Sequence, residues 1–325
     1  MRGWLILGAG LLALTILSLT RGEVALSLAD LWRGLTLGEG PGALTLRVLR
    51  GPRVLTALGA GAALGLSGAV FQTLLRNPLA APDVMGFNAG SGLAVVAALV
   101  LGLVLPMPLL AAAGGVVAAL AVGLISHRRG EADNSLTLIL VGLGMGFTAS
   151  GLATFLMLTM PDPMAAEAQR WVTGSLAARS WSHVGQVWVM AGVLALLLAL
   201  QLRGLGLLEL GPDLARGLGL RITRARNGLL ATAVLLAASG VAVAGPVPFV
   251  ALMAGPLGIG LTRARLPGGR LAAAGAAGAA ITVAADLLAR SALSGIQLPV
   301  GVMTGLLGAP YLLWLLSREF GKGEV

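Results

Sequence analysis

Long apolar runs alternate with short polar connectors along the whole of the 325-residue chain. Runs of about 20 apolar residues recur, and each can cross the hydrocarbon core of a bilayer as a helix. Backbone groups in lipid must be satisfied within the protein, which leaves helices or closed barrels, and continuous apolar runs exclude the alternating strands of a barrel. The pattern therefore predicts an all-α polytopic membrane protein with a single transmembrane domain, residues 1–325.

Ten membrane spans are predicted, because prolines, glycines and charged residues interrupt the apolar pattern between them. The predicted spans are Gly3–Leu19, Val54–Leu75, Ala89–Leu105, Leu110–Ser126, Leu136–Thr159, Val184–Leu202, Gly228–Val247, Phe249–Leu261, Leu271–Ser294 and Val300–Leu316. The eighth is a half-length span that contains glycine and proline. Three glycine pairs are spaced for close helix contacts: Gly61-x-x-x-Gly65, Gly142-x-x-x-Gly146 and Gly301-x-x-x-Gly305.

An even number of spans places both termini on one side of the membrane. Basic residues concentrate in the connectors on that side: Arg128, Arg129, Arg203, Arg216, Arg221, Arg224, Arg226, Arg263, Arg265, Arg270, Arg318 and Lys322. Short loops rich in Lys and Arg stay in the cytoplasm, so both termini are predicted to be cytoplasmic. The cluster Arg47, Arg50 and Arg53 lies on the outer side against this rule, and either an acidic partner or lipid phosphates would explain it.

Composition narrows the possible chemistry. The chain is 57% hydrophobic and 11% charged. Its net charge of +9 comes from basic residues in short loops, where membrane topology accounts for them, so binding to nucleic acid is not indicated. There is no cysteine, and His127 and His183 lie in separate loops, so the sequence offers no thiolate site and a poor histidine metal site. No phosphate-binding loop of the form G-x-x-x-x-G-K-[ST] occurs, so any ATP would be bound by another subunit.

The most polar internal run is Glu209–Asn227, between the sixth and seventh predicted spans. Pro212 can open a helix after Gly211, and Asp213 would then lie at the positive end of the helix dipole. Leu214 and Leu218 fall on one face at i, i+4, whereas Gly217 and Gly219 limit the helix to about two turns. We interpret the run either as a short amphipathic helix contacted by another protein or as a basic loop that only fixes topology.

Asp286 is the clearest ionisable residue within a predicted span. Arg290 follows at i+4 near the outer interface, where the carboxylate can neutralise the guanidinium. A structural ion pair is favoured over a proton relay, because no second membrane carboxylate accompanies Asp286. The same absence disfavours an ion-coupled pump.

Several motifs occur in order from the second span to the last. They are Arg50-Gly51-Pro52-Arg53, Gly65-Leu66-Ser67-Gly68 with Gln72, Arg76-Asn77-Pro78-Leu79-Ala80 with Pro82-Asp83 and Gly86, Trp171–Leu176, Ala215–Leu220, Ala285-Asp286 with Arg290, Leu298–Gly301, and Leu307–Pro310. Together they resemble the FecCD permeases, the membrane subunits of type II ABC importers for iron–siderophore complexes, haem and vitamin B12. The run Asn77–Gly90 and Gln297 are most similar to ferric-enterobactin-type permeases.

The resemblance implies the fold of the vitamin B12 permease and a permease subunit that imports a ferric siderophore across the bacterial inner membrane. This chain would be no enzyme and would bind no cofactor or metal, since ATP and Mg would be used by two partner ATPase subunits. A second permease chain, identical or related, and a periplasmic or lipid-anchored substrate-binding protein would complete the importer.

The resemblance also implies roles for individual residues. A coupling helix at about 211–220 would contact the ATPase through Asp213, Leu214, Ala215, Arg216, Gly217, Leu218, Gly219 and Leu220. A cytoplasmic gate and first coupling loop would contain Asn77, Pro78 and Leu79. Carboxylates of the binding protein would meet Arg50, Arg53 and Arg290.

Two stretches depart from the family pattern. The family usually has Leu in place of Gly51, and its Ala-Pro-His/Gln-x-x-Arg segment is here Ala254–Ile259, without the polar and basic positions. A haem or vitamin B12 permease of the same family stays as an alternative. An ion-coupled secondary transporter that acts alone is the alternative from another class. A membrane-embedded enzyme is disfavoured, because no His, Cys or paired carboxylates cluster.

Overall fold

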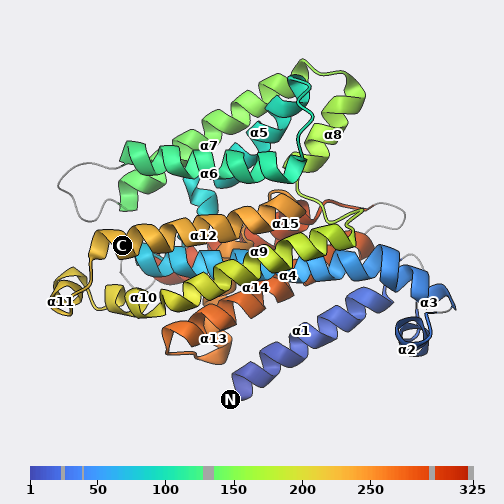
Figure 1. The fold of residues 1–325 in the computed structure, drawn as a ribbon, viewed down its shortest axis with the longest axis horizontal. Coiled ribbons are helices and arrows are strands. Elements are labelled where there is room, and N and C mark those ends of the chain that lie inside the picture. The colour runs from blue at the N-terminus through green and yellow to red at the C-terminus, as the bar shows by residue number, and fades with distance from the viewer. Residues whose placement is uncertain (23–25, 39, 127–134, 293–296, 321–325) are drawn as a thin grey trace.

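The computed structural model describes residues 1–22, 26–38, 40–126, 135–292 and 297–320. Within these ranges the regular structure is helical, with no strand, and most of the long helices lie along one general direction (Figure 1). Parts of the predicted loops and tail, including His127, Arg128, Arg129 and Lys322, lie outside the described residues. The predicted all-α class is confirmed.

Each of the ten predicted spans corresponds to a helix. They are α1 (Arg2–Thr20), α4 (Gly51–Leu75), α5 (Phe87–Val100), α6 (Met107–Ser126), α7 (Ser135–Leu158), α9 (Trp181–Leu200), α12 (Ile222–Ala244), α13 (Val250–Thr262), α14 (Pro267–Ser291) and α15 (Val300–Phe320). Among the described residues, eight helical stretches are long and apolar enough to cross a membrane. The other two helices, α5 and α13, are apolar but shorter.

The connectors contain helices that the sequence analysis did not predict. They are α2 (Leu28–Thr36), α3 (Gly40–Leu44), the π-helix η1 (Thr45–Arg50), the 3-10 turn η2 (Pro82–Met85), α8 (Asp162–Val172) and α10 (Leu202–Glu209). Local capping stabilises α2, because Asp30 N donates to Ser27 Oγ (3.1 Å) and Ser27 N donates back to Asp30 Oδ2 (3.0 Å). A search for long apolar runs passes over such short, partly polar helices.

The bundle has two ends (Figure 1). One end, named here the α11 end, carries α10, α11 (Pro212–Gly217) and the C-terminal part of α15; the opposite end, the α2 end, carries α2 and α3. The helix α4 connects the two ends. It continues from η1 at the α2 end, and Arg76, the residue after its last turn, donates to the carbonyl of Leu208 in α10 (3.3 Å).

Small residues let α4 approach α14 closely. Gly61 and Gly65 lie against the backbone of Gly278 and Ala274, where an added Cβ atom would overlap with carbonyl oxygens. The predicted close contact at the first glycine pair is therefore confirmed. The pair Gly301-x-x-x-Gly305 does not show such a contact at its second glycine, because a Cβ atom at Gly305 would meet no atom within 4 Å.

The helical stretch that includes α4 begins earlier than predicted. Residues Gly42–Leu75 form one apolar stretch of 34 residues, because η1 continues into α4. At the junction the N–H of Gly51 donates to the carbonyl of Leu46, five residues back, as in a π-helix. A Cβ atom at Gly51 would overlap with that carbonyl oxygen. The tight π-to-α junction thus gives a physical reason for a glycine at position 51.

Pro256 lies inside α13, where it removes one helical hydrogen bond. The carbonyl that loses its helical donor is that of Leu252, four residues back. Gln72 of α4 replaces the missing donor, since its Nε2 donates to Leu252 O at 2.9 Å. Gly255 makes room for this side chain, because a Cβ atom there would overlap with Gln72 Oε1. The altered segment Ala254–Ile259 is therefore matched to a polar side chain from a neighbouring helix.

Replacing Gln72 with Ala leaves the Leu252 carbonyl buried without a donor. We expect a loss of about 1–3 kcal/mol in unfolding free energy, measured by denaturation in detergent. In a Pro256→Ala background the new Ala N–H pairs with Leu252 O, so the same Gln72→Ala change should cost less than about 1 kcal/mol. An equal cost in the two backgrounds would show that Gln72 does not substitute for the missing helical donor.

Candidate functional site

The predicted short helix in the polar run exists as α11, Pro212–Gly217. Pro212 occupies its first turn, and Gly211 precedes it with a φ of 104°, a conformation that glycine tolerates. The chain leaves the helix through Gly219, whose φ is 80°. One boundary was wrong: α12 begins at Ile222, so Arg224 and Arg226 belong to that helix rather than to a loop before Gly228.

One face of α11 is apolar and uncovered. Leu214 of α11 and Leu218, the residue after its last turn, are 62% and 58% exposed, and Leu210, which precedes the non-helical Gly211, is 55% exposed. The opposite side is anchored by Ala215, which is fully buried. Arg216 Nη1 lies 3.2 Å from Asp213 Oδ1 across an exposed i, i+3 pair. A strip of leucines edged by charges, projecting from the end of the bundle, is typical of a surface that another protein covers.

The loop Asn77–Leu79 lies at the same end of the bundle, directly after α4. Asn77 Oδ1 accepts a hydrogen bond from Leu79 N (2.8 Å), which closes an Asx turn. Gln72 Nε2 donates to Pro78 O as well as to Leu252 O, both at 2.9 Å. One amide therefore ties this loop to α4 and α13.

At the α2 end, Asp286 holds two arginines. Arg290 Nε lies 3.1 Å from Asp286 Oδ2, which is the predicted i, i+4 ion pair. The sequence analysis missed a second partner: Arg53 Nη2 lies 2.8 Å from Asp286 Oδ1, and Arg53 Nε donates to the same carboxylate. Gln297 Oε1 accepts from Arg53 Nη1 (3.1 Å). Because Asp286 is 1% exposed and Arg53 is 9% exposed, this is a buried ion pair that joins α4 to α14.

Two arginines also cap the C-terminus of α1. Arg50 Nη1 donates to the carbonyls of Leu19 (2.9 Å) and Thr20 (3.1 Å), and Arg290 Nη2 donates to the carbonyl of Ser18 (3.1 Å). The last carbonyls of a helix have no helical partner and carry partial negative charge, so cations stabilise them. Arg50 and Arg290 therefore bind the end of α1, whatever else they contact.

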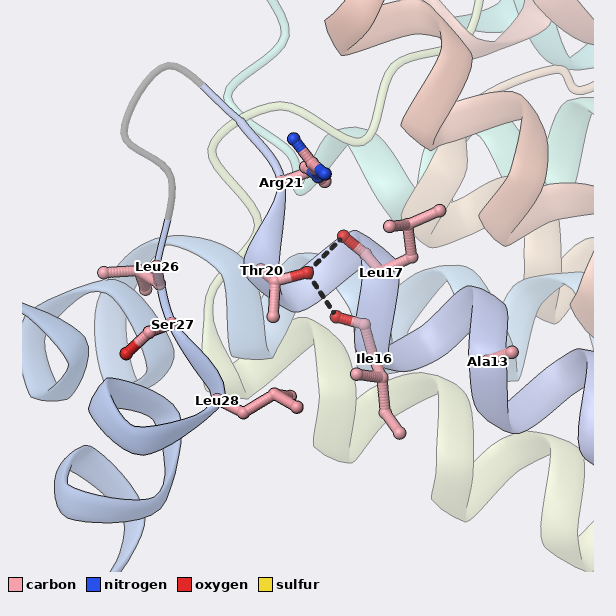
Figure 2. A pocket seen from close by; sticks show the side chains of 8 residues that line it. All are labelled: Ala13, Ile16, Leu17, Thr20, Arg21, Leu26, Ser27 and Leu28. Carbon is pink, nitrogen blue, oxygen red and sulfur yellow. Dashed lines mark hydrogen bonds between the residues drawn. The ribbon is translucent and has the colours of Figure 1, made fainter.

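Figure 2 shows the pocket beside this end of α1, with a volume of about 690 Å³. Its lining side chains are Ala13, Ile16, Leu17, Thr20, Arg21, Leu26, Ser27 and Leu28. Thr20 Oγ1 is occupied, since it donates to the carbonyls of Ile16 and Leu17. Because α1 is exposed along most of its length, the pocket opens to the surroundings of the bundle.

The α2 end contains another arginine besides Arg50, Arg53 and Arg290. Arg179, in the loop between α8 and α9, lies near Arg53, and burial together with the charge of Arg53 lowers the pKa of Arg179. Its Nη2 donates to the Ser175 carbonyl (2.9 Å), whereas its Nε is buried without a hydrogen-bond partner. Arg179 was not predicted as a site residue. In the sequence it belongs to the polar connector between the fifth and sixth predicted spans, which the span count predicts on the outer side, against the positive-inside pattern.

A groove of about 440 Å³ lies between η2, α5, α7 and the start of α15. Its polar lining residues are Asp83, Asn88, Ser150 and Thr173. Asp83 accepts hydrogen bonds from Asn88 Nδ2 (2.8 Å) and from Phe249 N (3.2 Å), and Asn88 Oδ1 is buried without a partner. Gly142, Gly146 and Phe147 of α7 form one wall. The groove carries few polar groups, and no set of three or more His, Cys, Asp or Glu in the described part of the chain could hold a metal ion.

The chain matches the FecCD transport family over residues 10–318. The ferric enterobactin transport system permease protein FepG of Escherichia coli (strain K12) is 39% identical over 319 residues, which cover 94% of this chain and 93% of that protein. The Fe(3+) dicitrate transport system permease protein FecD of the same strain is 38% identical over 275 residues, which cover 82% and 83%.

A solved structure is similar over the whole fold. It is described as an inward-facing conformation of a putative metal-chelate type ABC transporter. Its TM-score is 0.81 at 27% identity, and the match covers 98% of this chain and 99% of that one. The similarity therefore includes both ends of the bundle.

Proposed function

This chain belongs to the FecCD transport family, and we propose that it is the membrane permease subunit of an ABC importer for a ferric siderophore. The observation that carries the proposal is the match over residues 10–318, together with relatives named for ferric enterobactin and Fe(3+) dicitrate. The chain has no phosphate-binding loop of its own, so ATP and Mg are used by two separate ATPase subunits.

The exposed face of α11 supports contact with an ATPase. Leu214 and Leu218 project from the end of the bundle, and Asp213 and Arg216 offer charges beside them. Residues Asp213–Leu220 form the coupling segment, and Asn77, Pro78 and Leu79 form the cytoplasmic gate beside it. This assignment places the α11 end and both termini in the cytoplasm, with the chain in the bacterial inner membrane.

The α2 end then faces outward and receives the substrate-binding protein. An excess of arginine at that end favours a partner surface with carboxylates. Arg50, Arg53 and Arg290 are the docking residues in this proposal, with the buried Asp286 holding Arg53 and Arg290 in place. A second permease chain, identical or related, completes the path, and the groove along α7 is this chain's share of it.

Proteoliposomes that contain this chain, its ATPase partners and its binding protein should take up a ferric catecholate only when ATP is supplied. A proton gradient alone should give no uptake. The importer switches between two states only when a ligand binds one state more tightly than the other, and here that ligand is ATP. Uptake of radioactive iron is measured with ATP and, separately, with a proton gradient alone. Proton-driven transport by the chain alone would favour a secondary transporter. If the binding protein binds haem or cobalamin more tightly than ferric catecholates, the substrate is that compound and not a siderophore.

Reversing the charge of Arg216 by Arg216→Glu should weaken association with the ATPase by about tenfold or more, a loss of about 1.4 kcal/mol. The change puts a negative charge next to Asp213 at the tip of α11. Co-purification and titration of the ATPase measure the effect. Arg224→Glu is the matched control, since Arg224 is exposed on α12 outside the coupling segment. Intact association and uptake in Arg216→Glu would contradict the coupling role of α11.

Neutralising Arg50 and Arg53 together with glutamine should weaken docking of the binding protein, because the α2 end loses two largely buried positive charges that would attract its carboxylates. The Arg53 change also breaks a buried ion pair, which costs about 3–5 kcal/mol in stability. Asp286→Asn is therefore the control, since it breaks the same pair and keeps both cations. Docking that stays unchanged in the arginine variant, or falls equally in Asp286→Asn, would rule out a direct docking role.

A further inference from the structure

The short helix α10 stands between α11 and the membrane bundle (Figure 1). It ends at Glu209, and Leu210 and Gly211 alone separate it from α11. The buried Leu205 packs α10 into the core. A displacement of α11 would therefore be passed to α10 through only two residues. The contacts of the C-terminal end of α10 determine which helices it would act on.

An ion pair attaches that end of α10 to the beginning of α14. Glu209 Oε1 lies 2.6 Å from Arg270 Nη1. Arg270 Nη2 lies 3.5 Å from Thr73 Oγ1 in the last turn of α4. A second contact reaches the same turn, because Arg76 Nη2 donates to the carbonyl of Leu208 (3.3 Å). Two arginines thus connect the last two residues of α10 with the end of α4.

The end of α4 leads directly into the loop Asn77–Leu79. Arg76 is the C-cap of α4 and has a φ of 48°, a left-handed conformation that is uncommon for arginine. The neighbouring Gln72 holds the loop through the Pro78 carbonyl. Movement of Glu209 relative to the bundle therefore acts on the turn of α4 that positions this loop.

The Glu209–Arg270 pair contributes little to the stability of the fold. Its side chains are 29% and 30% exposed, and pairs this accessible to water contribute about 0–1 kcal/mol. The Arg53–Asp286 pair at the opposite end is different, because it is buried. A pair this weak can break and form again without unfolding the bundle.

We propose that Glu209 and Arg270 are positioning residues that transmit the displacement of α11 to the last turn of α4 and the Asn77–Leu79 loop. The inference rests on the proposed function, since it requires an ATPase that moves α11. It adds a route between the coupling segment and the gate, made from residues that neither segment contains.

The test uses the complete importer in proteoliposomes and measures ATP hydrolysis and substrate uptake in the same vesicles. In Glu209→Gln and Arg270→Gln, ATP hydrolysis and ATPase association should persist, while uptake per ATP falls about fivefold or more, the lower range of allosteric coupling. The charge-swapped double variant Glu209→Arg with Arg270→Glu should recover much of the lost coupling. Arg265→Gln is the matched control, because it removes an exposed arginine from the connector just before α14 without touching the pair.

Unchanged uptake per ATP in Glu209→Gln would overturn the inference. So would a parallel loss of hydrolysis, uptake and thermal stability that the charge swap does not repair, because that pattern indicates a purely structural pair. Failure of the proposed function looks different: the unaltered chain would then bind no ATPase and show no ATP-driven uptake.

Discussion

The ion pairs of Asp286 organise the α2 end of the molecule. A carboxylate that is 1% exposed can stay charged only with cations beside it, and here Arg53 and Arg290 reach it from α4 and from its own helix. Arg290 and Arg50 in turn satisfy the last carbonyls of α1. Three helices are thus joined by charges that would be too costly to leave unpaired, and the arginines proposed to meet the binding protein are held in place before it arrives.

The same demand for satisfied backbone groups explains how the half-length helix α13 accommodates a proline. Pro256 leaves the Leu252 carbonyl without its helical donor, and Gln72 supplies one from α4. That amide also holds the Pro78 carbonyl, so the repair of a helix defect and the position of the proposed gate loop depend on one side chain. The glycine at 255 belongs to this arrangement, since any larger residue would displace Gln72.

The two ends of the bundle differ in how their charges are held. At the α2 end the central pair is buried and links helices rigidly. At the α11 end the pairs Glu209–Arg270 and Asp213–Arg216 are partly or largely exposed to water. Exposed pairs are weak and exchange easily, which suits the proposed movement of α11, whereas buried pairs suit the proposed docking surface, which must keep its shape.

The sequence by itself determined the all-helical fold, a helix in each of the ten predicted spans, the short helix α11 and the pair Asp286–Arg290, because each depends on periodicity or spacing within one segment. It also singled out Arg50, Arg53 and Asn77–Leu79 as candidates. Only the tertiary structure decided that Arg53 shares Asp286, 233 residues away, that Gln72 reaches Leu252, and that Glu209 meets Arg270. Those contacts join side chains from different helices, and their partners are set by how the helices pack, which no local pattern records.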